Sequence, residues 1–212
     1  MAGTDRACGR ATDPAARARR PARPGHRQLH SSTRGAGARG AGGARAVSPP
    51  DHASRGVEPP QFRQLLGRFA TGVTVLTSRS PNDEPIGMTA NSLASVSLEP
   101  PLVLVSVEKR HDMHTAMEKG THFVFNILSS EQEALSRAFA ASEPDRFRGV
   151  SYRENQRGIA ILDGVVAHIE CEKQAAVPGG DHTVFIGLVV GGDVSDRRPL
   201  LYYRGGYAGL SR

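Results

Sequence analysis

The chain has 212 residues, of which 38% are hydrophobic, and its 27 Lys and Arg outnumber its 21 Asp and Glu to give a formal net charge of +6. Its two cysteines, Cys8 and Cys171, exclude a disulfide framework, and no apolar run approaches the roughly 20 residues that cross a bilayer. No secretory apolar segment occurs either. The composition therefore predicts a cytoplasmic protein that does not engage a membrane.

The composition changes abruptly near Val57. Residues 1–56 contain eleven Arg and three Asp, a net of +8, but one Leu, one Val and no Ile, Phe or Tyr. Such a segment cannot bury enough apolar surface to offset its ordering entropy. We therefore expect a disordered Arg/Ala/Gly/Pro-rich tail over residues 1–56 and one folded domain over residues 57–212, whose 16 basic and 18 acidic residues give a net of −2.

The basic tail suggests a phosphate-rich partner, but its composition argues against one. It has no aromatic residue for stacking on bases and no apolar face for a lipid surface. The segment GAGARG (35–40) matches G-x-G-x-x-G, yet neither a strand nor a helix flanks it. We expect no specific nucleic-acid partner; a targeting peptide, or a start codon assigned too far upstream, are the alternative explanations of the tail.

The sequence of the first half of the folded domain predicts a helix followed by strands. Residues 59–72 (PPQFRQLLGRFATG) place Phe62, Leu65, Leu66 and Phe69 at helical spacing. VTVLTS (73–78) is rich in β-branched residues, SPNDEP (80–85) has turn chemistry, and IGMTANS (86–92) begins an antiparallel return strand. SLASVSLEPP (92–101) alternates, and the nearly continuous apolar run PLVLVSV (101–107) predicts a strand buried on both faces.

The second half adds two short helices and four strands. HDMHTAMEKG (111–120) is helical with Gly120 as terminator, and SSEQEALSRAFA (129–140) predicts a helix capped by Ser130 and Glu133 as a capping box. The strands are HFVFNIL (122–128) and three later segments, VVAHIECEKQAAV, TVFIGLVVGGDV and LLYYRGG. Many strands with few helices predict a mainly β protein, a β-barrel with peripheral helices.

Two groups of polar residues invite a functional interpretation. His111 and His114 have a spacing that suits one helical face, but no third ligand lies at a telling distance, so no metal site is expected. Asp181 and His182 follow two glycines at the start of a strand, where they form either a reactive pair or an ordinary turn. The residues alone favour the turn.

Five segments, taken together, favour a functional site. FATGVTVLTS, PIGMTANSLASVSLEPPLVLVSV, FVFNIL, GGDHTVFIGLV and RPLLYYRGGY occur in that order between residues 62 and 209. This series resembles the flavin reductase family that serves two-component monooxygenases, the FMN-binding split barrel. The resemblance covers about 70% of the chain and excludes the tail.

The resemblance implies a flavin site on three segments. Its residues would be Pro85, Ile86, Gly87, Met88, Thr89, Asn91, Ser92, Ser106, Val107, Glu108 and Phe139. Gly87, Met88 and Thr89 would line the isoalloxazine through backbone groups, while Asn91 and Ser92 would bind the ribityl chain or phosphate. Many members offer hydroxyls in the following loop, whereas this chain has KRHDMH, which shifts phosphate contact to Lys109, Arg110 or His111 and leaves FMN and FAD both open.

The resemblance also implies a nicotinamide site. His182 would lie at the flavin face as the catalytic residue, holding the nicotinamide and supplying a proton or polarising the reduced flavin, with Asp181 orienting its ring. The remaining contacts would be Arg198, Pro199, Leu200, Leu201 and Tyr203.

The implied function is an NAD(P)H:flavin oxidoreductase that supplies reduced FMN or FAD to a separate oxygenase, acting as a homodimer. NADH and NADPH both stay open as hydride donors. The alternative is a flavin-binding module of the same barrel that stores or relays electrons without rapid turnover of the nicotinamide.

Overall fold

The computed structural model describes residues 56–141, 143 and 145–210, so residues 1–55 of the expected disordered tail, including the GAGARG segment, lie outside the described residues. The described helices are α1 (Pro59–Leu66), α2 (Asp112–Lys119) and α3 (Glu133–Ala140). The strands are β1 (Thr71–Gly72), β2 (Thr74–Arg79), β3 (Pro85–Ala90), β4 (Ala94–Leu98), β5 (Pro101–Glu108), β6 (His122–Ile127), β7 (Tyr152–Glu154), β8 (Ala160–Leu162), β9 (Ala167–Gly179), β10 (His182–Val194), β11 (Leu201–Tyr203) and β12 (Gly206–Ala208). No described helix is long and apolar enough to cross a membrane.

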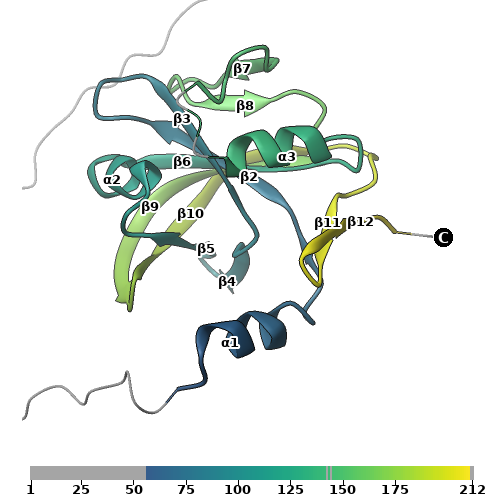
Figure 1. Ribbon diagram of the computed structural model, residues 1–212. Helices are drawn as coiled ribbons and strands as arrows, with labels where there is room; N and C mark the ends of the chain where they lie inside the picture. Colours follow the sequence, from purple (N-terminus) through teal and green to yellow (C-terminus); the bar gives the residue numbers. More distant parts are fainter. Residues whose placement is uncertain (1–55, 142, 144, 211–212) are drawn as a thin grey trace, which may run out of the picture. The chain divides into compact units, whose positions relative to one another are not determined.

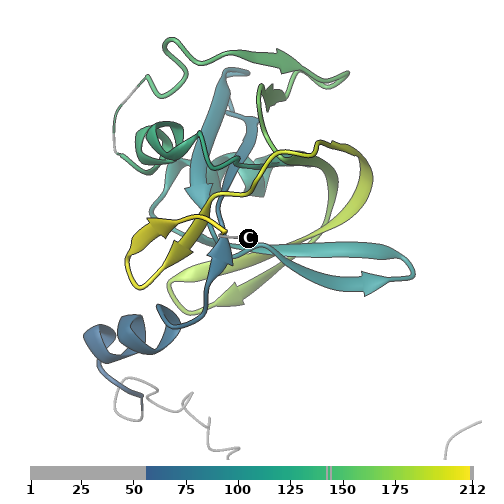
Figure 2. The same cartoon turned by 90° about the vertical axis from the view of Figure 1, so that its right-hand side faces the viewer.

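The main feature of the fold is a seven-stranded antiparallel sheet with the order β3-β2-β6-β9-β10-β5-β4. The long strands β9 and β10 bend strongly, so the sheet curves around a core, as Figures 1 and 2 show. Within the described residues its edges, β3 and β4, do not pair with each other, which gives an open, split barrel. The expected mainly β fold is confirmed.

The sheet has cores on two sides because side chains alternate along each strand. On β2, Leu76 packs with Val105, Phe185 and residues of α2, whereas its neighbour Val75 packs with Phe139 of α3. The two helices therefore cover different faces of the same strand. This division leaves β3, the neighbour of β2 at the sheet edge, between α2 and α3.

Two expectations about the elements are corrected. On β5 only the side chains of Val103, Val105 and Val107 are buried, while the alternate residues are half-buried or exposed, so one face alone meets the core of this chain. Helix α3 begins at Glu133 with Gln132 as its N-cap and no side-chain cap bond, because Glu133 pairs with Arg137 instead. The predicted capping box is therefore wrong.

Helix α1 forms where the spacing predicted it, yet it buries no residue. Phe62, Leu65 and Leu66 are each more than half exposed, and Phe69 just beyond the helix is 72% exposed. The amphipathic pattern thus has no partner within the described residues. Its carboxyl end is held to the β11–β12 turn, where Arg204 N donates to Gly67 O at 2.8 Å.

Candidate active site

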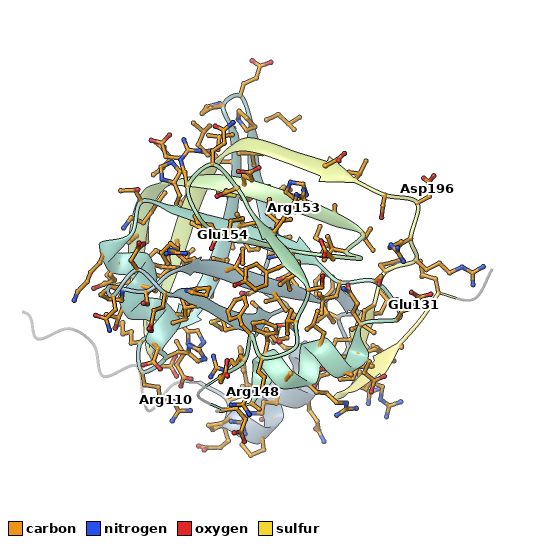
Figure 3. The ribbon with its side chains drawn as sticks, turned by 90° about the horizontal axis from the view of Figure 1, so that it is seen from above. Arg110, Glu131, Arg148, Arg153, Glu154 and Asp196 are labelled. Carbon is orange, nitrogen blue, oxygen red and sulfur yellow. The ribbon has the colours of Figure 1, made fainter. Side chains whose placement is uncertain are left out.

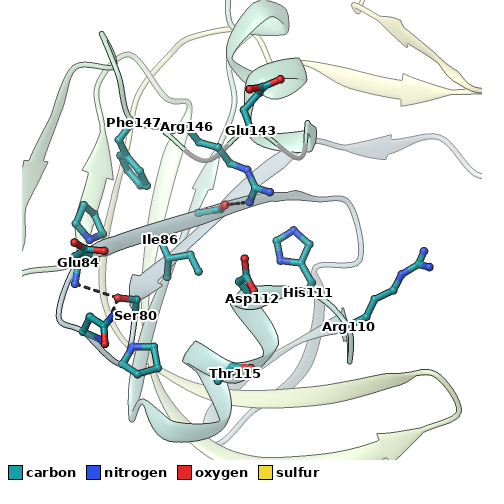
Figure 4. A pocket seen from close by; sticks show the side chains of 14 residues that line it. Ser80, Glu84, Ile86, Arg110, His111, Asp112, Thr115, Glu143, Arg146 and Phe147 are labelled. Carbon is teal, nitrogen blue, oxygen red and sulfur yellow. Dashed lines mark hydrogen bonds between the residues drawn. The ribbon is translucent and has the colours of Figure 1, made fainter.

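A pocket of about 650 Å³ opens beside the start of β3 (Figure 4). Its walls come from the β2–β3 turn, the amino-terminal end of α2 and the segment after α3. The lining residues are Ser80, Pro81, Asn82, Glu84, Pro85, Ile86, Gly87, Arg110, His111, Asp112, Thr115, Glu143, Arg146 and Phe147. Three of the expected flavin residues, Pro85, Ile86 and Gly87, therefore share one cavity with residues that the motifs did not identify.

The edge strand β3 presents unpaired backbone to this region. Ile86, Met88 and Ala90 belong to the core that α2 covers. The carbonyl of Gly87 instead points away from β2 and accepts a hydrogen bond from Arg146 Nη1 at 2.9 Å. Since both backbone groups of one residue in an antiparallel strand point to the same side, the N–H of Gly87 faces the open edge as well.

A glycine is required at position 87 by the packing of α3. A Cβ built on Gly87 would lie 2.5 Å from Cε1 and 2.8 Å from Cδ1 of Phe139. The aromatic ring of Phe139, which is fully buried, therefore lies against the flat backbone of β3. Phe139 therefore packs against β3 and has no solvent-accessible surface.

The pair formed by Asp181 and His182 lies at the other side of the site, where β10 begins. His182 Nδ1 and Asp181 Oδ1 are 2.7 Å apart, and the bond to the imidazole holds the pKa of the Asp181 carboxyl below its usual value. The His182 side chain is 41% exposed. An oriented, accessible imidazole is what a group that gives or takes a proton needs.

The β5–β10 register places His182 beside other expected site residues. His182 pairs with Glu108 and Val184 with Ser106, so these side chains share the face of the sheet opposite to the buried Val107 and Thr183. Glu108 pairs with Arg110, whose Nε lies 2.6 Å from Glu108 Oε1. Arg110 also lines the pocket beside β3, whereas His182 and Glu108 do not.

Side-chain hydrogen bonds already engage two of the expected flavin residues, Ser92 and Thr89. The hydroxyl of Ser92 accepts from Ser106 N at 3.1 Å and donates to Ser106 O at 3.2 Å, which extends the β4–β5 pairing. Thr89 Oγ1 donates to Ser136 O at 2.6 Å, fastening β3 to α3. Asn91 is exposed and lines a smaller cavity of about 210 Å³ together with Thr89 and Tyr202.

The expected nicotinamide segment lies in a different part of the domain. Arg198 O accepts a hydrogen bond from Ser130 N at 2.8 Å, and Leu200 N donates to Leu128 O at 2.9 Å. Between them, Pro199 forms an isolated antiparallel β-bridge with Ser129. Leu200 is buried, and Leu201 continues into β11 opposite Gly72. Within the described residues this segment, with the exposed Tyr203, does not line the pocket beside β3.

The two histidines of HDMH have separate roles. His111 is the N-cap of α2, with its Nδ1 accepting from Met113 N at 3.1 Å. His114 is buried, and its Nε2 lies 2.8 Å from Thr183 Oγ1. They are therefore not a pair of ligands on one helical face, and the described residues hold no cluster of three or more possible metal ligands.

Sequence reasoning missed the segment after α3. Glu143, Arg146 and Phe147 line the pocket, but the stretch around them has no periodicity and gave no motif to interpret. The available signal was DRF (145–147), a cation beside an aromatic residue in an otherwise irregular stretch. The packing of Phe147 against Phe139, with ring centroids 5.0 Å apart, helps to bring Arg146 to β3.

Comparison with known proteins agrees with this geometry. Residues 66–211 match the model of the flavin reductase like domain. The chain is 39% identical over 159 residues to the reductase subunit HsaB of a flavin-dependent monooxygenase from Rhodococcus jostii, covering 74% of this chain and 81% of that protein. It is 42% identical over 151 residues to the FMN reductase (NADH) SmoA of Agrobacterium fabrum, covering 71% and 86%.

A solved structure extends the comparison to three dimensions. The NADH:FAD oxidoreductase SgcE6 of Streptomyces globisporus, crystallised with NAD and FAD fragments, superposes with a TM-score of 0.69 at 38% identity, covering 73% of this chain and 96% of that one. The protein therefore belongs to the flavin reductase family. The family and the enzyme class predicted from the sequence, an oxidoreductase acting on flavin, are confirmed.

Proposed function

We propose that this protein uses NADH or NADPH to reduce FMN or FAD and supplies the reduced flavin to a separate oxygenase component. The observation that carries this proposal is the family match over residues 66–211, and the β5–β10 register, which places His182 beside Glu108 and Val184 beside Ser106, supports it. The names of the relatives support it: one is the reductase subunit of a monooxygenase, another an FMN reductase that uses NADH.

The residues present suit a flavin. The N–H of Gly87 faces the open edge of β3, where a planar ring can accept a hydrogen bond from it, while the ring of Phe139 fills the place that a side chain at position 87 would occupy. Arg146 Nε is buried without a hydrogen-bond partner among the described residues, so a polar ligand in the cavity would meet an unused donor. When bound, the flavin supplies the redox chemistry, accepting a hydride from the reduced nicotinamide.

The protein's own backbone groups and side chains would bind and orient the flavin and the nicotinamide. The β3 edge would hold the ring through backbone groups of Gly87 and Thr89, while Met88 anchors the strand in the core. Val107 is buried on the core side of β5, so that position contributes through its backbone alone, whereas Ser106 and Glu108 face the same side as His182. His182, held by Asp181, would position the nicotinamide and hold or move a proton at its Nε2.

We also propose that the protein is a homodimer. Leu102 and Leu104 of β5 and Val184, Ile186 and Leu188 of β10 share the face that carries His182, and each is only partly buried within the chain. A strand apolar on both faces normally has both faces covered. A second copy on this face would cover it and enclose the region of His182, where a hydride donor needs to be shielded from water.

We also propose that the chain consists of a catalytic domain and a separate tail. Residues 57–212 would form the catalytic domain, and residues 1–56 a tail that the chemistry does not need. The family match begins at residue 66, which supports this division. A cytoplasmic location would fit a consumer of reduced nicotinamide. Deleting residues 1–56 should leave flavin-linked NADH oxidation unchanged, and a large loss of activity would refute the division.

The decisive experiment follows the oxidation of NADH and of NADPH by the purified protein with FMN, FAD or no added flavin. Flavin-dependent oxidation is expected, and the variant His182→Ala should lower kcat/KM by roughly a hundredfold, a typical contribution of a positioned acid or base. The matched control is His122→Ala, a histidine of β6 that is hydrogen-bonded to Thr121 and lies outside the pocket.

Two other outcomes would change the conclusion. Tight flavin binding with negligible oxidation of either nicotinamide would leave the alternative, a flavin-binding module that stores or relays electrons. Equal activity of His182→Ala and His122→Ala would remove His182 from the catalytic machinery. Neither result would alter the family to which the chain belongs.

A further inference from the structure

The turn that carries the Asp181–His182 pair is exposed and short. Strands β9 and β10 pair as far as Gly179 and His182, so the loop between them consists of Gly180 and Asp181 alone. Both loop residues are exposed, and Gly180 has a φ of 66°, a left-handed conformation that glycine adopts without strain. An exposed loop of this kind opens at low cost, so a reactive group beside it needs a further restraint.

Lys109 supplies such a restraint from the neighbouring strand. The ladder between β5 and β10 ends at the pair formed by Glu108 and His182. Beyond this pair, Lys109 N donates to Asp181 O at 3.0 Å, and Lys109 Nζ donates to Gly180 O at 2.6 Å. One residue therefore bonds the carbonyl groups of both loop residues, one through its backbone and the other through its side chain.

The side chain of Lys109 differs in direction from those of the next two residues. Arg110 is 84% exposed, lies at the periphery of the domain (Figure 3) and pairs with Glu108. Arg110 and His111 line the pocket beside β3, whereas Lys109 does not. None of the ion pairs between described residues includes Lys109. Of the three basic residues expected near the phosphate, Lys109 therefore serves the β9–β10 turn instead.

The start of β10 is also held from the core side, but only from Thr183 onward. The buried Thr183 Oγ1 lies 2.8 Å from Nε2 of the buried His114 in α2. The Asp181 side chain, in contrast, is 84% exposed, and a bond between exposed charged groups contributes little by itself. The position of Asp181 relative to His182 thus depends on the backbone of the turn.

We infer that Lys109 is a positioning residue, which holds the β9–β10 turn so that Asp181 orients the imidazole of His182. The inference rests on the proposed function, in which His182 acts on the nicotinamide, and adds a residue that acts through His182 without touching a ligand. The positive charge of Nζ strengthens its bond to the Gly180 carbonyl. Because Lys109 N also fixes the carbonyl of Asp181, it restricts the positions from which that carboxylate can reach His182 Nδ1.

The test measures kcat/KM for NADH oxidation with FMN on the full chain. Lys109→Met keeps the length of the side chain but removes the ammonium group. It should lower kcat/KM about threefold to tenfold, because one exposed charged hydrogen bond is lost while Lys109 N still bonds Asp181 O. The dissociation constant of FMN should stay unchanged, since Lys109 does not line the pocket.

The matched control is Lys119→Met. Lys119 is an exposed lysine at the end of α2, and no ion pair between described residues includes it. Its substitution should change neither kcat/KM nor the binding of FMN. Circular dichroism of all variants should match that of the wild type, since both lysines are exposed.

Two further variants separate positioning from a general loss of structure. Lys109→Arg keeps a charged donor that can reach Gly180 O, so it should recover most of the lost activity. In the His182→Ala background, Lys109→Met should cause no further loss of kcat/KM. A residue that acts only through His182 has nothing left to position there, and its effect is therefore not additive.

Several results would overturn the inference. Unchanged kcat/KM in Lys109→Met, or failure of Lys109→Arg to recover activity, would remove the role of the bond to Gly180 O. Equal losses from Lys109→Met with and without His182 would mean that Lys109 only supports the fold. Weakened FMN binding would assign Lys109 to the flavin. If the wild type oxidised neither nicotinamide with any flavin, the proposed function itself would be wrong.

Discussion

At the scale of single residues, two positions that line the pocket show how the packing of the chain determines which polar groups a ligand can reach. Gly87 is required because the ring of Phe139 occupies the place where any Cβ would lie. His111 is held in one tautomer because it caps the helix that follows it. In both cases a structural requirement leaves a group available to a ligand: the backbone N–H of Gly87 at the strand edge and the Nε2 donor of His111.

Substituting Gly87 by Ala should destabilise the fold by about 1–3 kcal/mol, a usual cost of forcing a methyl group into a filled space. The reason is the 2.5 Å approach of the new Cβ to Phe139 Cε1. Urea unfolding of both proteins measures the difference. Gly72→Ala is the control, since nothing lies within 4 Å of a Cβ built there. Equal stability of Gly87→Ala and the wild type would contradict the packing described here.

The stability of the protein should depend on the protonation of His111. Burial first, and the charge of Arg146 second, lower the pKa of His111 below its ordinary value of 6.5. The unfolded chain therefore binds the proton more readily than the folded one, and this residue's contribution to stability is lost as the pH falls below 6.5. Between pH 7 and pH 5 the free energy of unfolding should fall more in the wild type than in His111→Gln.

The effects of burial and of the Arg146 charge on the pKa of His111 can be separated by following the imidazole signals by NMR. Arg146→Ala should raise the pKa of His111, since it removes the repulsion but leaves the burial. Arg148→Ala should not move it. A His111 pKa unaffected by Arg146→Ala would show that the two groups are not close in solution.

At the scale of elements, one buried amide joins three strands. Asn126 of β6 donates to Val75 O and Thr77 Oγ1 of β2, both at 3.1 Å, and accepts from Leu162 N of β8 at 2.8 Å. Thr77 Oγ1 in turn donates to Ala160 O at 2.6 Å. The short hairpin β7–β8 is thereby attached to the main sheet, and with it the segment that carries Arg146 and Phe147 into the pocket.

Replacing Asn126 by Ala should destabilise the protein by roughly 2–3 kcal/mol, because the buried N–H of Leu162 loses its acceptor. Urea unfolding gives this value directly. The control is Asn82→Ala on the exposed β2–β3 turn, which should change the free energy of unfolding by less than about 0.5 kcal/mol. A change as small for Asn126→Ala would mean that β8 is held by apolar contacts alone.

At the scale of the whole molecule, the described chain leaves apolar surface uncovered in two places. The outer face of β5 and β10 carries partly buried Leu and Ile, and α1 exposes Phe62, Leu65 and Leu66. Exposed apolar patches of this extent are typical of interaction sites. Because the first patch lies on the face of His182, association through it would affect the site, whereas α1 has no described contact with the pocket.

The protein should sediment as a dimer, and charges placed on this outer face should dissociate it. Leu104→Lys and Ile186→Lys alter residues that are directly paired between β5 and β10. Both variants should shift the sedimentation coefficient to that of a monomer and retain the circular dichroism of the folded protein. Ala138→Lys, on the exposed side of α3, is the control and should remain dimeric. A monomeric wild type would refute the homodimer.

The sequence by itself determined the order and type of most elements, because they depend on local patterns. Alternation and β-branched runs identified β2, β3, β5, β6, β9 and β10, and helical spacing identified α1 and α2. The five motifs identified the family, and they include Gly87 and His182. What remained open locally was the choice between an Asp-His turn and a reactive pair, which the residues alone could not decide.

Only the tertiary structure decided which residues meet. Arg146 reaches Gly87 across 59 positions of the chain, and His182 pairs with Glu108, because strand order and register bring them together. The segment around Arg146 has no periodic pattern, so its place depends on Phe147 packing against Phe139 and on Asn126 holding β8. Contacts between distant segments depend on how buried surfaces fit together. The apolar run of β5 shows this, because the sequence alone predicts burial of both faces, whereas in the described chain only one face is buried.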